Sequence, residues 1–236
     1  MAKSQRSLPG LRRDFSNRIN SYTMIKPFGP SILETYLPEN ILQSFLILTD
    51  DLLNDPNRKS HGKYLVGQIQ EEPLISNEIL RRHDVFDYLK AMFAEYVLAS
   101  ASVNADPDYQ QDVSQFQASS GYQNPVTVDI QAAWLVSQKG GEYNPIHNHS
   151  RATLSSVLYL KVPEKSGANT IPNKVETDGD IEFVEGSTLP LQNATVRTSP
   201  EVGKFLIFPS YLLHLVYPFQ GEQERRSVSI NASHQL

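Results

Sequence analysis

The 236-residue sequence contains no cysteine, and this absence restricts the chemistry available to the protein. Disulfide bonds and metal sites built from cysteine thiolates are excluded, so any metal site must use His, Asp or Glu side chains. No apolar run approaches the roughly 20 residues of a transmembrane helix. Residues 1–8 also lack the apolar core of a signal peptide. We therefore expect a cytoplasmic protein with no membrane partner.

An excess of positive charge is also missing. The 21 Lys and Arg residues are dispersed among 26 Asp and Glu residues, and the formal net charge is −5. A surface that binds the phosphate backbone of a nucleic acid is usually basic, so the charge predicts no evident nucleic-acid surface; a local basic groove is the alternative. Hydrophobic residues make up 39% of the sequence, which predicts a folded core. No oligomeric state is predicted.

The pattern along the chain predicts a single domain, residues 1–236, in which helices precede strands. Residues 1–22 are basic and weakly patterned, and we expect them to form an N-terminal arm. Residues 23–120 are expected to form a helical buttress and a loop, and residues 121–236 a strand-rich core. The polar stretch 101–125 is interpreted as a surface loop and a candidate lid.

Within the buttress, apolar residues recur at helical spacing from Pro38 to Leu53 and again after Ser76, which is suited to capping a helix. A short strand is predicted from Thr23. After residue 125 the periodicity becomes that of strands. The strand-like runs are 126–137, 153–162, 180–184, 194–198, 203–208, 212–217 and 225–231. Many short strands are typical of a β-sandwich or jelly roll, and we expect the helices to pack outside one sheet.

Three histidines in the strand-rich part form the clearest candidate site. His147 and His149 end the run Gly141-Glu-Tyr-Asn-Pro-Ile-His-Asn-His, and His214 ends the run Phe208-Pro-Ser-Tyr-Leu-Leu-His. Residues two apart in an extended segment point to the same face, so the first two imidazoles are expected to aim together, with Asn148 turned away. His214 would supply a third ligand. Three protein ligands leave coordination positions open for catalysis.

The alternative reading of a histidine is an ordinary surface or core residue without a ligand. We apply that reading to His61, His83 and His234. Three imidazoles would also suit Zn, Ni or Cu, so the histidines alone do not choose the metal. Trp134, the single tryptophan, fits either core packing or a platform for substrate.

Four segments resemble those of the Fe(II)/2-oxoglutarate-dependent oxygenases of bacteria and phages, over about residues 125–232. They are Asn144-Pro-Ile-His-Asn-His-Ser, Leu154-Ser-Ser-Val-Leu-Tyr-Leu, Phe208-Pro-Ser-Tyr-Leu-Leu-His and Glu224-Arg-Arg-Ser-Val-Ser-Ile-Asn. The resemblance implies an α+β fold with a double-stranded β-helix (jelly-roll) core and N-terminal helices packed on the larger sheet. It also implies a dioxygenase that uses Fe(II), 2-oxoglutarate and O2. Such an enzyme hydroxylates a primary substrate, unidentified here, while 2-oxoglutarate is decarboxylated to succinate and CO2. A phage-encoded member would work in the host cytoplasm.

In these enzymes, iron is held by His-x-Asp or His-x-Glu and a distal His. An Arg or Lys some ten residues later binds the far carboxylate of 2-oxoglutarate. The resemblance therefore assigns His147 and His214 as ligands and Arg225 as the carboxylate anchor. His149 stands where the carboxylate is normally found, and its neutral imidazole would leave the iron site one unit more positive. A two-His site without His149 remains an alternative.

Strand alternation places Arg225 and Arg226 on opposite faces. Arg225 shares its face with Ser227, and the Arg-x-Ser pattern of 2-oxoglutarate sites matches this pair. We predict that both bind the cosubstrate; a surface salt bridge with nearby glutamates is the alternative for the arginine. Tyr159 either donates its hydroxyl to the same carboxylate or fills the barrel.

Two other functions fit parts of this pattern. Cupins share the jelly roll and a similar spacing, here Gly141-x5-His147-x-His149 and Gly203-x5-Pro209-x-Tyr211-x2-His214. A cupin-like metalloenzyme with a three-His site would not need 2-oxoglutarate. The cupin glutamate after the first motif is missing, and Tyr211 replaces a glycine, so Arg225 and Ser227 favour the oxygenase. A non-catalytic jelly-roll module for binding or assembly is the second alternative.

Overall fold

Two β-sheets and a layer of helices make up the part of the chain that the computed structural model describes, residues 4–6, 22–25, 29–104, 126–164, 176–187 and 193–235. The helices are α1 (Glu39–Asn54), α2 (Asn77–Arg82) and α3 (Phe86–Asn104), with a 3₁₀ turn at Gly62–Tyr64. The strands are β1 (Ser4–Arg6), β2 (Tyr22–Ile25), β3 (Ile32–Tyr36), β4 (Leu74–Ile75), β5 (Thr127–Gln138), β6 (Asn144–His147), β7 (Leu154–Lys161), β8 (Ile181–Val184), β9 (Thr195–Thr198), β10 (Lys204–Pro209), β11 (Leu213–Val216) and β12 (Arg225–Gln235).

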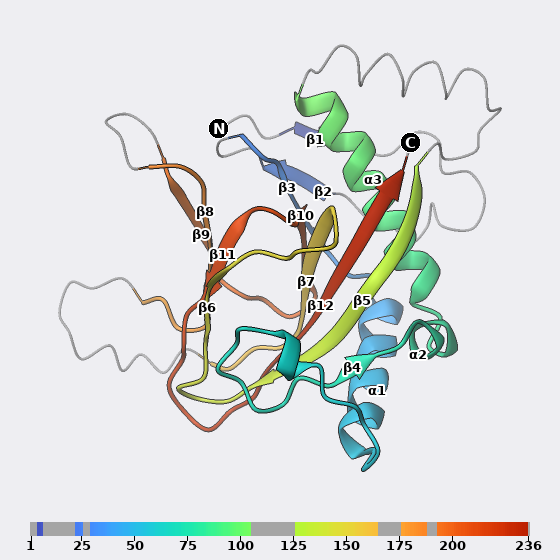
Figure 1. The fold of residues 1–236 in the computed structure, drawn as a ribbon, viewed down its shortest axis with the longest axis vertical. Helices are drawn as coiled ribbons and strands as arrows, with labels where there is room; N and C mark the ends of the chain where they lie inside the picture. Colours follow the sequence, from blue (N-terminus) through green and yellow to red (C-terminus); the bar gives the residue numbers. More distant parts are fainter. Residues whose placement is uncertain are drawn as a thin grey trace.

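The two sheets have the arrangement of a jelly roll. The larger sheet has the order β1-β2-β3-β10-β7-β12-β5-β4, and the smaller has the order β6-β11-β8-β9. Figure 1 shows the smaller sheet facing the larger one, with the helices on the far side of the larger sheet. Each of the seven strand-like runs predicted after residue 125 contains a strand. The predicted helices are also present, and the Ser76 side chain caps α2 by accepting a hydrogen bond from Ile79 N.

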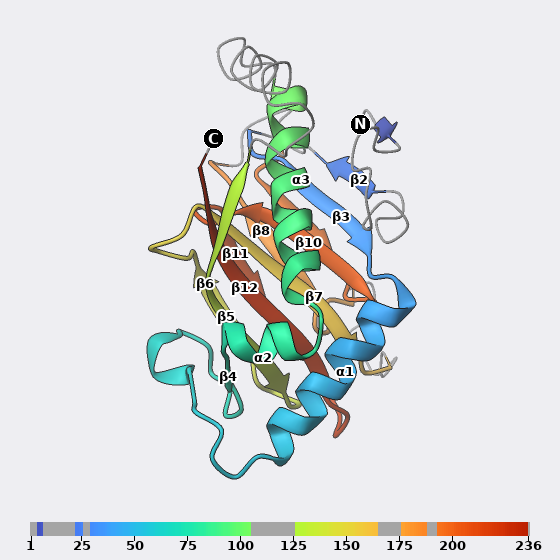
Figure 2. The same cartoon turned by 90° about the vertical axis from the view of Figure 1, so that its right-hand side faces the viewer.

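The helices are attached to the larger sheet by the main hydrophobic core. In α1 the buried side chains recur at helical spacing and include Ile41, Phe45 and Leu48. They pack in one cluster with α3 and with the outward-facing residues of the sheet, such as Leu158 and Ile230. Figure 2 shows α1, α2 and α3 lying across that face. Because burial of one such side chain contributes about 1.5–3 kcal/mol, this layer holds the sheet in a fixed shape.

A smaller hydrophobic cluster lies between the two sheets. It includes Val157, Tyr159, Phe183 and Phe208. The inward face of β12 is polar instead, because Ser227, Ser229 and Asn231 lie there and line a pocket. The space between the sheets is therefore part packed core and part open site.

Four strands were not predicted, and other predictions lie beyond the described residues. These strands are β1, β3, which lies between β2 and β10, β6, which carries His147 at its end, and the two-residue β4, which pairs with β5. Helix α3 continues to Asn104, so residues 101–104 of the loop and candidate lid predicted at 101–125 are helical, and residues 105–125 lie outside the described part. Of the predicted arm, Ser4–Arg6 form β1 and Tyr22 begins β2.

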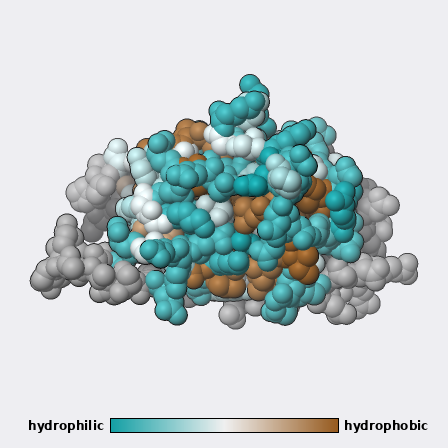
Figure 3. All heavy atoms as spheres, turned by 90° about the horizontal axis from the view of Figure 1, so that it is seen from below, coloured by the Kyte–Doolittle hydropathy of each residue, from teal (hydrophilic) through white to brown (hydrophobic). Residues whose placement is uncertain are grey.

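The surface seen from below is mostly hydrophilic, with hydrophobic side chains gathered in several patches (Figure 3). Among the described residues, no helix combines the length and the apolar character that a membrane crossing requires.

Candidate metal centre

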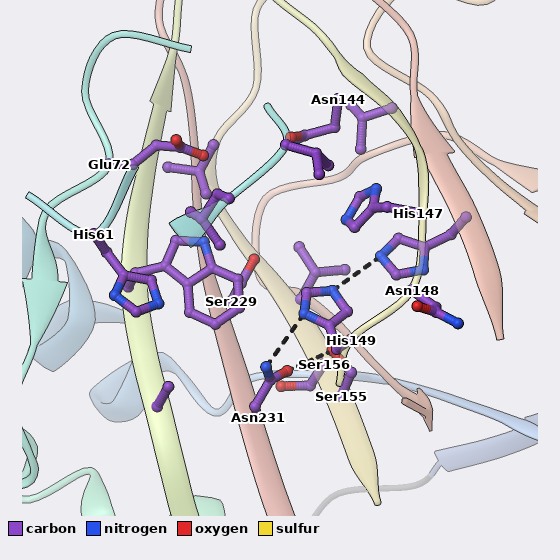
Figure 4. Close-up of a pocket in the computed structure, with 18 of the residues that line it drawn as sticks. His61, Glu72, Asn144, His147, Asn148, His149, Ser155, Ser156, Ser229 and Asn231 are labelled. Carbon is purple, nitrogen blue, oxygen red and sulfur yellow. Dashed lines mark hydrogen bonds between the residues drawn. The ribbon is translucent and has the colours of Figure 1, made fainter. Parts of the chain in front are cut away.

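The fold brings His147, His149 and His214 together. His147 in β6 and His214 in β11 are partners in the smaller sheet. His149 lies just beyond β6, where its backbone N–H donates to the backbone carbonyl of Ser210 at 2.9 Å. One ring nitrogen from each residue lies within 4.8 Å of the other two, and the Nε2 atoms of His149 and His214 are 3.2 Å apart (Figure 4). These three side chains can therefore contact a single metal ion.

Backbone carbonyls orient two of the three rings. The Nδ1 atom of His147 lies 2.7 Å from Pro145 O, and that of His214 lies 2.9 Å from Leu212 O. A carbonyl oxygen only accepts hydrogen bonds, so each Nδ1 carries the proton and each Nε2 presents a lone pair. In metal-binding histidines, the ring nitrogen that does not face the metal is typically held by such a hydrogen bond.

A side chain orients the third ring. His149 Nδ1 lies 3.2 Å from the Asn231 side-chain amide, which in turn contacts the Ser155 hydroxyl at 3.0 Å. β6 ends at His147, so His149 is in a loop rather than on the predicted strand. Asn148, which was expected to turn away, is more exposed than its two histidine neighbours, and it also lines the pocket.

All three imidazoles are held in the neutral form that a metal requires. Burial lowers the pKa of His147, although the Pro145 carbonyl opposes this. Burial and the neighbouring His147 lower the pKa of His149 to about 4. The pKa of His214 falls well below its usual value because of burial and the two adjacent imidazoles. The donor set therefore fits a divalent cation without first losing protons.

Arg225 provides a buried positive charge in the same pocket. Its side chain is 1% exposed, and Nη1 donates to Gln138 Oε1 at 3.1 Å. Among the described residues, Nε and Nη2 have no hydrogen-bond partner. Burial lowers the pKa of this guanidinium, while Tyr159 and Asp180 raise it. A buried guanidinium with unpaired donors fits an anionic ligand such as a carboxylate, which accepts two parallel hydrogen bonds.

The other two predicted cosubstrate residues lie next to Arg225. Ser227 lines the pocket. Tyr159 is fully buried beneath the arginine, with its ring centroid 5.0 Å from the guanidinium carbon. Its hydroxyl has no hydrogen-bond partner in the described part of the chain. Burial raises its pKa to about 12, although Arg225 opposes this, so the hydroxyl keeps its proton and can donate it. Tyr159 is not among the pocket-lining residues.

Arg226 points to the opposite face of the sheet, as strand alternation predicts. It forms ion pairs with Glu224 at 2.8 Å and with Asp50 of α1. The pocket-side position of Arg225 therefore agrees with the choice made from the sequence.

The pocket has a volume of about 710 Å³, within the range of small-molecule sites. Its lining includes two residues that sequence reasoning missed, His61 and Glu72. From the sequence, His61 was interpreted as a surface or core residue without a ligand, so its position in the pocket was not anticipated. Its ring lies 5.3 Å from that of Trp134, which lies 5.6 Å from the ring of His149. Both missed residues belong to a loop region, whose path no periodicity in the sequence reveals.

Comparison with known proteins agrees with this geometry. Residues 132–231 match the sequence profile of the family described as "Putative 2OG-Fe(II) oxygenase". The matched segment contains all three histidines, Arg225 and Ser227. No curated protein gives a significant match.

Solved structures of the same fold cover most of the chain. A prolyl-4-hydroxylase from Pseudomonas putida is 15% identical, with a TM-score of 0.51 over 87% of this chain and 92% of that one. A prolyl hydroxylase from Trichoplax adhaerens, in complex with a peptide of hypoxia inducible factor, is 14% identical, with a TM-score of 0.53 over 87% and 83%. The carbocyclase SnoK from nogalamycin biosynthesis is 10% identical, with a TM-score of 0.53 over 86% and 79%. At these identities the likeness establishes the fold.

The predicted double-stranded β-helix fold is therefore confirmed. The resemblance to Fe(II)/2-oxoglutarate oxygenases is confirmed by the family match over residues 132–231, which supports an oxidoreductase. Fe(II) and 2-oxoglutarate are the cofactors that the class implies.

Proposed function

We propose that the protein is a dioxygenase that hydroxylates a primary substrate while 2-oxoglutarate is decarboxylated to succinate and CO2. His147, His149 and His214 would hold Fe(II). Arg225, assisted by Ser227 and Tyr159, would bind the far carboxylate of 2-oxoglutarate. The observation that carries the proposal is the presence, in one pocket, of three convergent neutral imidazoles and a buried arginine with unpaired donors.

The residues of the chain contribute binding, orientation and exclusion of water. When bound, Fe(II) and 2-oxoglutarate supply the oxidising chemistry. Arg225 lies beneath the pocket with its guanidinium against the Tyr159 ring, so an anion that pairs with it is removed from bulk water. The electrostatic attraction is stronger in such a buried position than at the surface. Two of the serines of β12, Ser227 and Ser229, add hydroxyl groups to the same wall.

The buried donors of Arg225 also distinguish this proposal from the two alternatives. A cupin-like metalloenzyme would not need an anion-binding arginine beside its metal. A non-catalytic module would need neither the arginine nor three oriented histidines. Unpaired buried donors cost about 1–3 kcal/mol each, so their retention is explained by a ligand that pairs with them.

An anaerobic titration tests the proposal. Metal-free protein receives Fe(II) and then 2-oxoglutarate, while the visible charge-transfer band of the iron–2-oxoglutarate chelate is recorded. We expect the wild type to develop the band. Arg225→Lys should raise the 2-oxoglutarate concentration needed by roughly tenfold or more, because lysine cannot reproduce the paired hydrogen bonds of a guanidinium.

The neighbouring residue provides a matched control. Arg226→Lys changes the same residue type on the same strand, but on the face that contacts α1, so its 2-oxoglutarate requirement should equal that of the wild type. If Arg225→Lys also left the requirement unchanged, Arg225 would not be the carboxylate anchor. Bound Fe(II) without any band would favour the cupin-like alternative, and failure to bind metal would favour the binding module.

A further inference from the structure

A second buried charged residue, Glu72, lines the pocket away from the residues assigned above. Figure 4 shows Glu72 and His61 on one side of the pocket and His147 and Asn148 on the other. Glu72 precedes β4, which pairs with β5 beside Trp134. Its side chain is 2% exposed, and Oε2 has no hydrogen-bond partner among the residues that the structure describes. Nothing in the proposed binding of iron or 2-oxoglutarate uses this carboxylate.

Two glycines lie against the Glu72 carboxylate. A Cβ atom at Gly62 would lie 3.2 Å from Oε2, and one at Gly67 would lie 3.1 Å from Oε1 and clash with the Asn144 side chain. Both distances are tighter than ordinary van der Waals contact, so a side chain at either position would press on the carboxylate or its neighbours. Directly after Gly67, a β-bridge between Gln68 and Tyr143 holds the segment against the jelly roll. The segment therefore packs closely against one side of the carboxylate.

The surroundings of Glu72 favour a positive charge. Among the described residues, no Lys, Arg or His forms a salt bridge with it. Glu142 is the nearby group whose charge acts on it: burial and then Glu142 raise the pKa of Glu72 to about 7. The His61 ring contacts two other aromatic rings, with centroid distances of 5.4 Å to Tyr64 and 5.3 Å to Trp134. Aromatic rings beside a carboxylate are a favourable environment for a cation.

We propose that Glu72 binds a cationic group, a primary ammonium, on the primary substrate of the enzyme. The carboxylate would gain the partner that its Oε2 lacks, and the pocket has room for such a substrate beside 2-oxoglutarate. The assignment to the primary substrate rests on the proposed function; the binding of a cation by the pocket does not.

The single tryptophan of the chain makes the subsite measurable without iron or 2-oxoglutarate. Trp134 lines the same pocket, so its fluorescence reports on occupancy. The probes are n-butylammonium chloride and the neutral 1-butanol, titrated into metal-free protein at equal ionic strength and pH 8. At that pH Glu72 is mostly ionised and His61, whose pKa is lowered by burial, is neutral. We expect the wild type to bind n-butylammonium at least roughly tenfold more tightly than 1-butanol.

Three variants show whether Glu72 causes this preference. Glu72→Gln keeps the shape and removes the charge, and it should abolish the preference. Gly67→Ala places a methyl group against the carboxylate and should also weaken n-butylammonium binding. Glu222→Gln changes the net charge equally at an exposed position and should behave as the wild type. Equal affinity for the two probes in the wild type, or an unchanged preference in Glu72→Gln, would overturn the proposal.

The two proposals fail in different ways. A cation preference in a protein that forms no charge-transfer band with Fe(II) and 2-oxoglutarate would refute the dioxygenase and leave the subsite standing. A charge-transfer band in a protein without the preference would refute the subsite alone.

Discussion

At the scale of single residues, Asn231 determines how His149 can serve as a ligand. An amide NH2 facing Nδ1 would leave the proton on Nε2, whereas an oxygen facing Nδ1 frees Nε2 for the metal. The two arrangements differ only by a rotation of the amide, and the Ser155 hydroxyl can accompany either because it both donates and accepts. In the proposed iron site, this contact would therefore control whether two imidazoles or three bind the metal.

Substitutions at Asn231 test this role. Asn231→Leu removes the contact and should lower Fe(II) affinity by about 10–100-fold, the usual cost of losing a partner that orients a ligand. Asn231→Asp always presents an oxygen to Nδ1 and should bind Fe(II) at least as tightly as the wild type. Anaerobic calorimetry measures both affinities. Ser229→Ala, on the same strand face, is the control, and equal losses in Asn231→Leu and Asn231→Asp would contradict the role.

At the scale of elements, Arg226 joins strand β12 to helix α1. It contacts Asp50 and Thr49 of the helix and Glu224 beside the strand, and Glu224 also accepts from the Ser137 hydroxyl at 2.6 Å. Burial favours protonation of Glu224, but Arg226, Ser137 and Lys161 outweigh it and hold its pKa at about 2. The helical layer is thus attached to the sheet by a charge network as well as by the hydrophobic core.

This network predicts a loss of stability in acid. Because the pKa of Glu224 is lower in the folded protein than its ordinary value of 4.5, its contribution is present above that value and is lost as the pH falls toward 2. The contribution is on the order of 2 kcal/mol. Urea unfolding measures the free energy of unfolding at pH 6 and at pH 3. Between these two values it should fall less in Glu224→Gln than in the wild type. Glu78→Gln, in an exposed pair with Arg82, should lose as much stability as the wild type does.

Periodicity predicted the elements better than it predicted the walls of the pocket. The alternation along residues 225–231 placed Arg225 and Ser227 on the inner face and Arg226 on the outer one, because a strand fixes the direction of each side chain. The same rule does not extend to His149, because β6 ends at His147. His61 and Glu72 could not be assigned from the sequence, since they reach the pocket through long-range bridges such as the one between Ser60 and Pro73.

At the scale of the whole molecule, the candidate metal centre links parts of the fold that are distant in the sequence. His147 and His214 come from the smaller sheet, and His149 contacts Asn231 of the larger one. If residues 1–236 fold as a single domain, as predicted from the sequence, this link would couple metal binding to the stability of the entire chain. An ion that binds the folded protein alone raises the free energy of unfolding of everything that unfolds together with the site.

Metal binding should therefore raise the melting temperature. Free Fe(II) at about 100 times its dissociation constant adds about 2.7 kcal/mol, which is roughly 5–10 °C for a domain of this size. Anaerobic calorimetric scans of the metal-free and Fe(II)-loaded protein measure the shift. His214→Ala should lose it, and His234→Ala, whose ring contacts Thr153 outside the cluster, should keep it. A shift retained in His214→Ala would show that the stabilising metal binds elsewhere, since His214 is the most buried of the three proposed ligands.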